Sequence, residues 1–116
     1  FDLLELVARK NLVRFDQFYA YSTCTPSRAA LLTGAPPSRA GIVYPIQHDD
    51  AYGIPDAVET LPEVFQKHGY RTALIGKWHQ GTGEGFHPNE RGFDYFCGML
   101  GGSHSYFPTK GPWSEI

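Results

Sequence analysis

The sequence contains too little of several residue types to fit some common classes of protein. Its two cysteines, Cys24 and Cys97, are too few for a disulfide framework and lack the paired spacing of a zinc site. The 12 acidic and 10 basic residues are interspersed, so no cationic surface for nucleic acid or an anionic membrane is predicted. The longest apolar runs are about five residues, far below the roughly 20 needed to span a bilayer. We therefore expect no nucleic-acid partner and no membrane span in this chain.

The composition is otherwise that of an ordinary globular sequence. Of the 116 residues, 41% are hydrophobic and 19% are charged, which suits one domain. No targeting segment opens the chain, which begins at Phe1 and enters an amphipathic pattern at once. Residues 111–116 supply no closing element. We therefore expect residues 1–116 to be part of a domain that is truncated at both ends.

Apolar periodicity predicts a helix, a strand and a second helix in the first third of the chain. Residues 2–10 have helical spacing, and residues 12–21 alternate and are rich in aromatic residues, which is typical of a strand. Thr25 is expected to cap the next helix, which ends at Gly34. Cys24 is therefore expected at a strand-to-helix turn.

The middle of the chain continues this alternation after a loop. Residues 36–56 have no sustained period, whereas residues 60–68 begin with a capping box and predict a helix. Residues 70–75 have the pattern of a buried strand, and residues 76–81 follow its carboxyl end, where α/β proteins bind ligands. The sequence therefore predicts an α/β fold with a largely parallel sheet flanked by helices.

The start of the second helix is a predicted anion site. Its free backbone N–H groups and the positive end of its dipole attract an anion, and Arg28 can add a forked charged donor. The same field would lower the pKa of a thiol at Cys24. These arguments leave open whether Cys24 is a thiolate nucleophile or a redox thiol.

This segment resembles the signature of the type I, formylglycine-dependent, arylsulfatase-like sulfatases. The matching residues are Cys24, Pro26, Ser27, Arg28, Leu31, Leu32, Thr33 and Gly34. The resemblance implies an alkaline-phosphatase-like fold and a Cys24 converted to Cα-formylglycine by a formylglycine-generating enzyme, which reads Cys-x-Pro-x-Arg in the unfolded chain. One hydroxyl of the aldehyde hydrate then attacks sulfur, and the second collapses to release sulfate.

Residues 76–81 resemble a second sulfatase segment, Gly-Lys-Trp-His-Leu-Gly, from which only Gln80 departs. The resemblance implies that Lys77 contacts a sulfate oxygen and that His79 hydrogen-bonds the hydrate and helps to remove its proton. An extended backbone would direct both side chains to one side. Lys77 and His79 are therefore predicted to share a catalytic task with Cys24 and Arg28.

Residues 86–96 resemble the family's Pro-x-x-Arg-Gly-Phe-Asp stretch, which leads into a glycine-rich segment. Ser103 and His104 in that segment are candidates for contacts with the sulfate or the leaving group. Cys97 is expected to be a core thiol. Three further histidines are expected on the surface or in loops: His48, His68 and His87.

The resemblance also implies one calcium ion that faces the formylglycine at position 24. In the family its other ligands are an Asp-Asp pair before the signature and a pair far downstream, so the pair Asp49 and Asp50, which follows the signature, is not assigned this role. The remaining ligands and the acid for the leaving group are expected outside this chain. We therefore expect the isolated chain to be inactive and marginally folded.

The predicted activity is hydrolysis of aryl or carbohydrate sulfate esters, with the sulfate ester as the substrate partner. Two alternatives stay open: a phosphonate or phosphodiester hydrolase of the same superfamily, and a non-catalytic anion-binding homologue. The segment at residues 76–81 favours sulfate. The resemblance implies a periplasmic, secreted or lysosomal parent protein.

Overall fold

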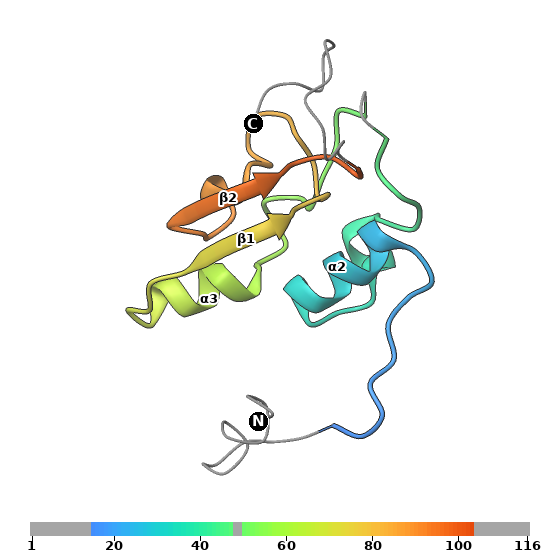
Figure 1. Cartoon of the computed structure of the whole chain (residues 1–116), viewed down its shortest axis with the longest axis horizontal. Helices are drawn as coiled ribbons and strands as arrows, with labels where there is room; N and C mark the ends of the chain where they lie inside the picture. The colour runs from blue at the N-terminus through green and yellow to red at the C-terminus, as the bar shows by residue number, and fades with distance from the viewer. Residues whose placement is uncertain (1–14, 48–49, 104–116) are drawn as a thin grey trace, which may run out of the picture.

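The computed structural model describes residues 15–47 and 50–103 (Figure 1). The expected helix over residues 2–10 lies outside them. In chain order the elements are α2 (Cys24–Thr33), the 3-10 helix η1 (Pro37–Ala40), α3 (Leu61–Lys67), β1 (Ala73–Lys77), the 3-10 helix η2 (Pro88–Glu90) and β2 (Tyr95–Met99).

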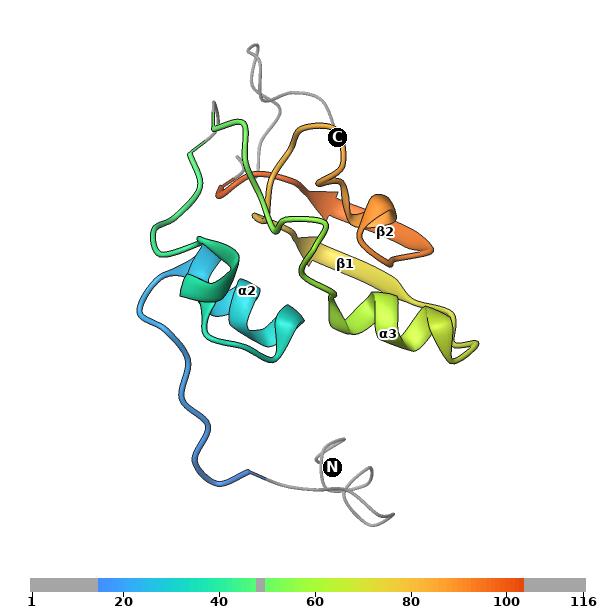
Figure 2. The same ribbon diagram turned by 180° about the vertical axis from the view of Figure 1, so that it is seen from behind.

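The two strands form a parallel pair with helices beside it. Ala73 pairs with Tyr95, and the register runs to Lys77 opposite Met99. Residues 78–94 make the crossover between the strands and include η2. Figures 1 and 2 show α2 and α3 on the β1 side of the pair, away from β2. This arrangement confirms the predicted α/β class, although no strand was predicted over β2.

Helix α2 begins two residues earlier than predicted. Thr23 is the N-cap and Cys24 is the first helical residue, so the prediction that Thr25 caps the helix is wrong. Thr25 lies instead in the first turn and is fully buried. Its hydroxyl tolerates this burial because it has hydrogen-bond partners in His79 and Ile46. Gly34 ends the helix as predicted, in the left-handed conformation with φ 64.

The strand predicted over residues 12–21 is not formed in its described part, residues 15–21. A strand is stable only when a neighbour completes its hydrogen-bond ladder, and no other strand of the described residues lies beside this segment. Its aromatic side chains are open to solvent, with Phe18 70% and Tyr19 84% exposed. Alternation alone therefore did not produce a strand.

A small apolar core lies between α2 and the segment that follows it. Ala29, Ala40, Ile42 and Ile54 are buried together. The residues predicted as loop thus contain η1 and two core isoleucines. Helix α3 begins at the predicted capping box, with the Thr60 backbone N–H donating to Glu63 at 2.6 Å.

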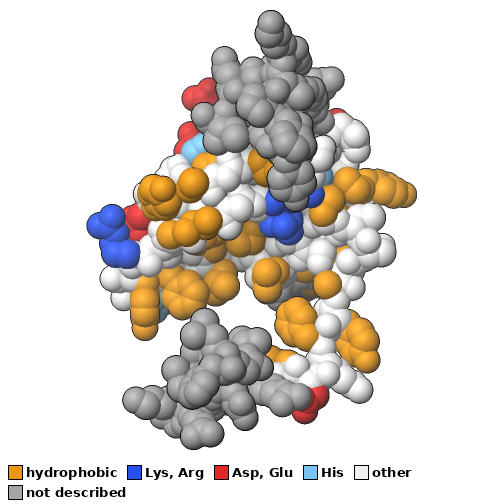
Figure 3. All heavy atoms as spheres, in the orientation of Figure 1, with side chains coloured by type: hydrophobic (Ala, Val, Ile, Leu, Met, Phe, Trp, Pro, Cys, Tyr) orange, Lys and Arg blue, Asp and Glu red, His pale blue; other side chains and the backbone are white. Residues whose placement is uncertain are grey.

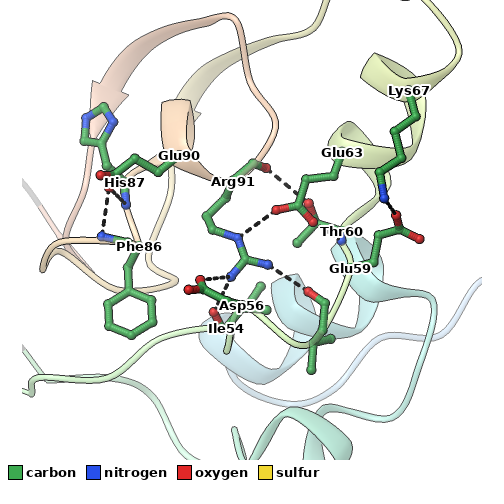
Figure 4. A network of polar contacts seen from close by, with 12 residues as sticks. Ile54, Asp56, Glu59, Thr60, Glu63, Lys67, Phe86, His87, Glu90 and Arg91 are labelled. Carbon is green, nitrogen blue, oxygen red and sulfur yellow. Dashed lines mark hydrogen bonds and ion pairs between the residues drawn. The ribbon is translucent and has the colours of Figure 1, made fainter.

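The guanidinium of Arg91 joins η2 to the start of α3 and to the chain before it (Figure 4). Arg91 is 1% exposed and donates to Glu63 Oε1 at 3.0 Å, to the Ile54 carbonyl at 2.5 Å and to the Val58 carbonyl at 2.7 Å. The carboxylate of Asp56 lies 3.4 Å from the same group. Every nitrogen of this buried cation therefore has an acceptor, which is the condition for burying a charge without a large cost.

The strand pair itself is open to solvent. Ile75 on β1 is 78% exposed and Cys97 on β2 is exposed, so the predictions of a buried strand over residues 70–75 and of a core thiol at Cys97 are wrong. Each strand has only the other as a neighbour in the part of the chain that is described, so little covers either face. Figure 3 shows the hydrophobic side chains that this leaves at the surface.

Two of the three remaining histidines lie in the described residues. His68 is exposed and His87 is half-buried at the start of η2, which fits the surface or loop positions predicted for them. His48 lies outside the described residues. None of the helices in residues 15–47 and 50–103 has the length and apolar character that crossing a membrane requires.

Candidate active site

The first residue of α2 meets the segment that follows β1. Cys24 Sγ lies 3.2 Å from His79 Nδ1, although the two residues are far apart in the sequence. Lys77, the last residue of β1, is close enough for its ammonium to interact with the Cys24 thiol. The structure therefore brings together three of the four residues predicted to act in catalysis.

The hydrogen bonds of His79 determine which of its nitrogens carries a proton. His79 Nε2 lies 2.8 Å from the Ile46 carbonyl, which can only accept, so this nitrogen must be the donor. In the neutral ring Nδ1 is then an acceptor, and it faces both Cys24 Sγ and Thr25 Oγ1 at 3.2 Å. The Ile46 N–H donates to Thr25 Oγ1 at 3.2 Å, which leaves the threonine proton free to point at Nδ1.

The backbone at His79 is not extended. Its φ is 57, in the left-handed region that residues other than glycine seldom adopt. The prediction that Lys77 and His79 share a side because they alternate on an extended chain is therefore wrong. They meet at Cys24 because the chain turns at His79, whose N–H is held by the Leu100 carbonyl at 2.9 Å.

The electrostatics of the site favour a neutral imidazole and an anionic group at position 24. Burial holds the pKa of His79 below its ordinary value; the Ile46 carbonyl opposes this shift, and the cations Lys77 and Arg28 reinforce it. Burial raises the pKa of the Cys24 thiol, but the Lys77 ammonium and the backbone N–H of Thr25 stabilise the thiolate, so the net pKa is lowered.

Arg28 connects helix α2 to the end of β1. Its Nη1 donates to the Lys77 backbone carbonyl at 2.6 Å, which ties α2 to the end of β1. Arg28 therefore holds the two elements that carry Cys24 and Lys77 at a fixed spacing.

The glycine-rich segment after β2 reaches the site through its backbone. Lys77 Nζ donates to the Gly102 carbonyl at 2.6 Å. Ser103 is exposed beside it, and His104 lies outside the described residues. The segment is thus placed next to Lys77.

Sequence reasoning missed three residues of the site. Thr25 was interpreted as a cap, and Ile46 contributes only backbone groups, for which the sequence carries no signal. Gln80, the one departure from the sulfatase segment, is fully buried and donates from Nε2 to the Thr25 carbonyl at 3.0 Å. Its Oε1 has no partner within the described residues.

The described residues do not assemble a metal site by themselves. They contain no group of three or more histidine, cysteine, aspartate or glutamate side chains that could hold an ion. Asp50 instead accepts the Gln47 backbone N–H at 2.6 Å, so it closes a turn.

Comparison with known proteins gives one consistent result. The family model described as Sulfatase matches residues 1–112. Arylsulfatase G of Mus musculus is 48% identical over 88 residues, which are 75% of this chain and 17% of that protein. N-acetylgalactosamine-6-sulfatase of Homo sapiens is 43% identical over 104 residues, which are 82% of this chain and 20% of that protein.

Solved structures of similar sequence have the same fold. Ps i-CgsB superposes with a TM-score of 0.70 at 41% identity, over 73% of this chain and 19% of that one. The PsFucS1 sulfatase from Pseudoalteromonas sp. gives a TM-score of 0.64 at 47% identity, over 72% of this chain and 17% of that one. The chain therefore spans about a fifth or less of the length of these relatives.

Proposed function

The chain belongs to the sulfatase family, and on this premise we propose that the whole protein hydrolyses sulfuric esters with a nucleophile made from Cys24. The observation that carries the proposal is the contact between Cys24 Sγ and His79 Nδ1 beside the Lys77 ammonium. It supports a scheme in which residue 24 is the nucleophile, His79 is the proton acceptor and Lys77 is the cation. Together such groups can support the transfer of a sulfuryl group from an anionic ester.

We propose that Cys24 is converted to Cα-formylglycine by a formylglycine-generating enzyme. One hydroxyl of the aldehyde hydrate attacks sulfur, and the S–O ester bond breaks to release the alcohol. Loss of the proton from the second hydroxyl then re-forms the aldehyde and breaks the bond between its carbon and the sulfated oxygen, which releases sulfate. The Cys24 Sγ marks the position that a hydrate hydroxyl takes, next to His79 Nδ1.

His79 is the proton acceptor of this scheme. Its Nε2–H is committed to the Ile46 carbonyl, so a proton from a hydroxyl at position 24 can be accepted only at Nδ1. The lowered pKa of His79 keeps the ring neutral and ready to accept at neutral pH. Lys77 turns its ammonium to a sulfate oxygen, and Arg28 keeps α2 against β1 while it does so.

Sulfatases generally carry a metal ion together with the formylglycine, and we propose that the ion here is calcium. Calcium prefers hard oxygen ligands, and a hydrate oxygen at position 24 would be one of them. The described residues contain no group of three or more histidine, cysteine, aspartate or glutamate side chains that could complete such a site.

Sulfated carbohydrates are the substrate class that we propose to test first. A relative at 43% identity is named for N-acetylgalactosamine 6-sulfate, and the Ps i-CgsB structure at 40% identity contains k-i-k-neocarrahexaose. Ser103 and His104 follow Gly102, which touches Lys77, so they are our candidates for substrate contacts. We place the protein in the periplasm, the lysosome or outside the cell, where sulfated carbohydrates occur.

The test is the mass of the tryptic peptide over residues 15–28, from full-length protein co-expressed with a formylglycine-generating enzyme. Conversion of Cys24 replaces sulfur by oxygen and removes two hydrogens, and the converted protein is expected to hydrolyse sulfate esters faster than phosphonate esters. Cys24→Ala is the matched control and is expected to be inactive. Faster phosphonate turnover would indicate a phosphonate or phosphodiester hydrolase, and an unconverted thiol with retained sulfate binding would indicate an anion-binding protein.

A further inference from the structure

The loop that follows β2 passes directly over the imidazole of His79. A Cβ placed on Gly102 would lie 2.9 Å from both Cε1 and Nε2 of His79, which is closer than real Cβ atoms approach other heavy atoms. The backbone of Gly102 is outside the left-handed region. Space, and not backbone conformation, therefore excludes a side chain at position 102.

The ring cannot retreat from this contact without losing a hydrogen bond. His79 is 7% exposed, its Nε2 is bound to the Ile46 carbonyl at 2.8 Å, and its Nδ1 faces Cys24 and Thr25. A methyl group on residue 102 must therefore displace either the imidazole or the loop.

Displacing the loop would disturb Lys77, the cation of the proposed site. The carbonyl of Gly102 accepts from Lys77 Nζ at 2.6 Å, so a loop that moves away from His79 draws this acceptor away from the ammonium. One residue thus touches both groups that surround position 24.

We propose that Gly102 is a positioning residue that fixes Lys77 and His79 around the nucleophile, an inference that rests on the proposed function. In the free site the neutral Gly102 carbonyl holds the Lys77 ammonium at the end of β1. A sulfate ester is an anion and a stronger acceptor for a cation than a carbonyl, so Lys77 exchanges this carbonyl for a sulfate oxygen when substrate binds.

The experiment compares Gly102→Ala with Gly101→Ala in the full-length enzyme that carries formylglycine. Gly101 is a matched control because nothing lies within 4 Å of a Cβ built on it. Gly102→Ala is expected to lower kcat by about 10- to 100-fold, more than it raises KM, because small misplacements of catalytic groups cost that much. Gly101→Ala is expected to change both constants by less than about twofold. Equal effects of the two substitutions would overturn the proposal.

A second readout separates this inference from the proposed function. In the unconverted protein, the rate of iodoacetamide alkylation at Cys24 is measured at one pH against the rate at the exposed Cys97 as internal reference. Gly102→Ala is expected to change this ratio by at least about threefold, because the surroundings of the thiol set its reactivity. A changed ratio, when the formylglycine-carrying form has no sulfatase activity, would reject the proposed function and keep the positioning role. An unchanged ratio in the unconverted protein, with an unchanged kcat in the active converted enzyme, would reject the positioning role.

A folding control keeps the proposal testable if Gly102→Ala does not fold. The double variant Gly102→Ala with His79→Ser removes the ring atoms that the added methyl group meets. Recovery of a cooperative melting transition in the double variant supports the steric contact with His79. Failure to recover would contradict it.

Discussion

At the residue scale, the hydroxyl of Thr25 links helix α2, which carries Cys24, to the imidazole of His79. It accepts the Ile46 N–H at 3.2 Å and lies 3.2 Å from His79 Nδ1, while Ile46 also accepts from His79 Nε2. The three residues form a closed ring of hydrogen bonds around one imidazole. Thr25 therefore orients His79 although it carries no charge.

We predict that Thr25→Val lowers kcat by about tenfold, since the imidazole loses one of the groups that orient Nδ1. The isosteric valine also leaves the buried Ile46 N–H without its acceptor, which costs about 1–3 kcal/mol of unfolding free energy. Steady-state kinetics at saturating sulfate ester and a melting curve measure the two effects. Thr25→Ser keeps the hydroxyl and is expected to retain most of kcat; a serine variant as slow as the valine variant would contradict the role.

The sequence predicted the charged residues and the cysteine of the site, but not the residues that hydrogen-bond to them and orient them. Cys24, Lys77 and His79 belong to motifs that resemble those of a known family, so their meeting could be expected before the fold was known. Thr25 occupies a variable position of the signature, and Ile46 acts through backbone atoms. Such contacts depend on three-dimensional proximity, which no local pattern encodes.

At the scale of elements, pairing with the neighbouring strand determines where each strand begins and ends, and the local apolar pattern does not. Strand β1 extends through Lys77, which was predicted to be loop, because its last residues pair with Gly98 and Met99 of β2. Strand β2 was not predicted, since the glycine within it weakens the strand signal. The helices were better predicted because Gly34 and the capping box at Thr60 are local signals.

Thr72 and Asp94 join the two strands just before each begins. The Thr72 N–H donates to Asp94 Oδ2 at 2.8 Å, and the Asp94 N–H donates to the Thr72 hydroxyl at 3.1 Å. The hydrogen bond from the Thr72 backbone lowers the pKa of Asp94, and the nearby Arg71 adds to the shift. The carboxylate therefore stabilises the fold more than the protonated acid does.

This shift gives a dependence of stability on pH. Because the folded pKa of Asp94 is depressed, its contribution is fully present above the ordinary aspartate pKa of about 3.9 and is lost as pH falls through the folded pKa. Asp94→Asn is expected to lower the melting temperature at neutral pH, and the difference from wild type is expected to disappear in acid. Glu84→Gln, at an exposed position, is the control. A difference that does not change with pH would contradict the assignment.

At the scale of the whole molecule, Arg91 connects segments of the chain that are not joined by hydrogen bonds within the short helices or between the strands. Its guanidinium holds the chain at Ile54 and Val58 and the start of α3 against η2, as Figure 4 shows. The stretch that includes Arg91 was recognised by resemblance as a lead-in to substrate contacts. In the structure its arginine has an architectural role.

We predict that Arg91→Ala lowers the free energy of unfolding by about 3–5 kcal/mol. The substitution removes the donor to Glu63 Oε1 and to the carbonyls of Ile54 and Val58. Arg91→Lys is expected to recover little of this loss, since one ammonium cannot reproduce the fork. Urea unfolding followed by tryptophan fluorescence in the full-length protein measures both. Arg39→Ala, at an exposed position, is expected to stay close to wild type, and an equal loss there would argue against a specific role for Arg91.

The isolated 116-residue chain is expected to unfold in a broad thermal transition. Both β1 and α2 leave large apolar side chains uncovered, with Ile75 78% and Leu31 64% exposed, so little buried apolar surface opposes the chain entropy. Calorimetry and amide hydrogen exchange test this. A sharp transition with slowly exchanging amides would show that the small core between α2 and Ile54 is sufficient for folding.

The burial of the first turn of α2 has a kinetic consequence for the protein's maturation. Thr25 and Pro26 are buried, and Arg28 is bound to the Lys77 carbonyl. A modifying enzyme that binds this segment in the unfolded chain therefore loses access to it once the chain has folded. If Cys24 is modified as proposed, modification and folding are competing reactions of the same nascent chain. The ratio of their two rates then sets the active fraction of the protein, because a chain that folds before modification keeps its thiol.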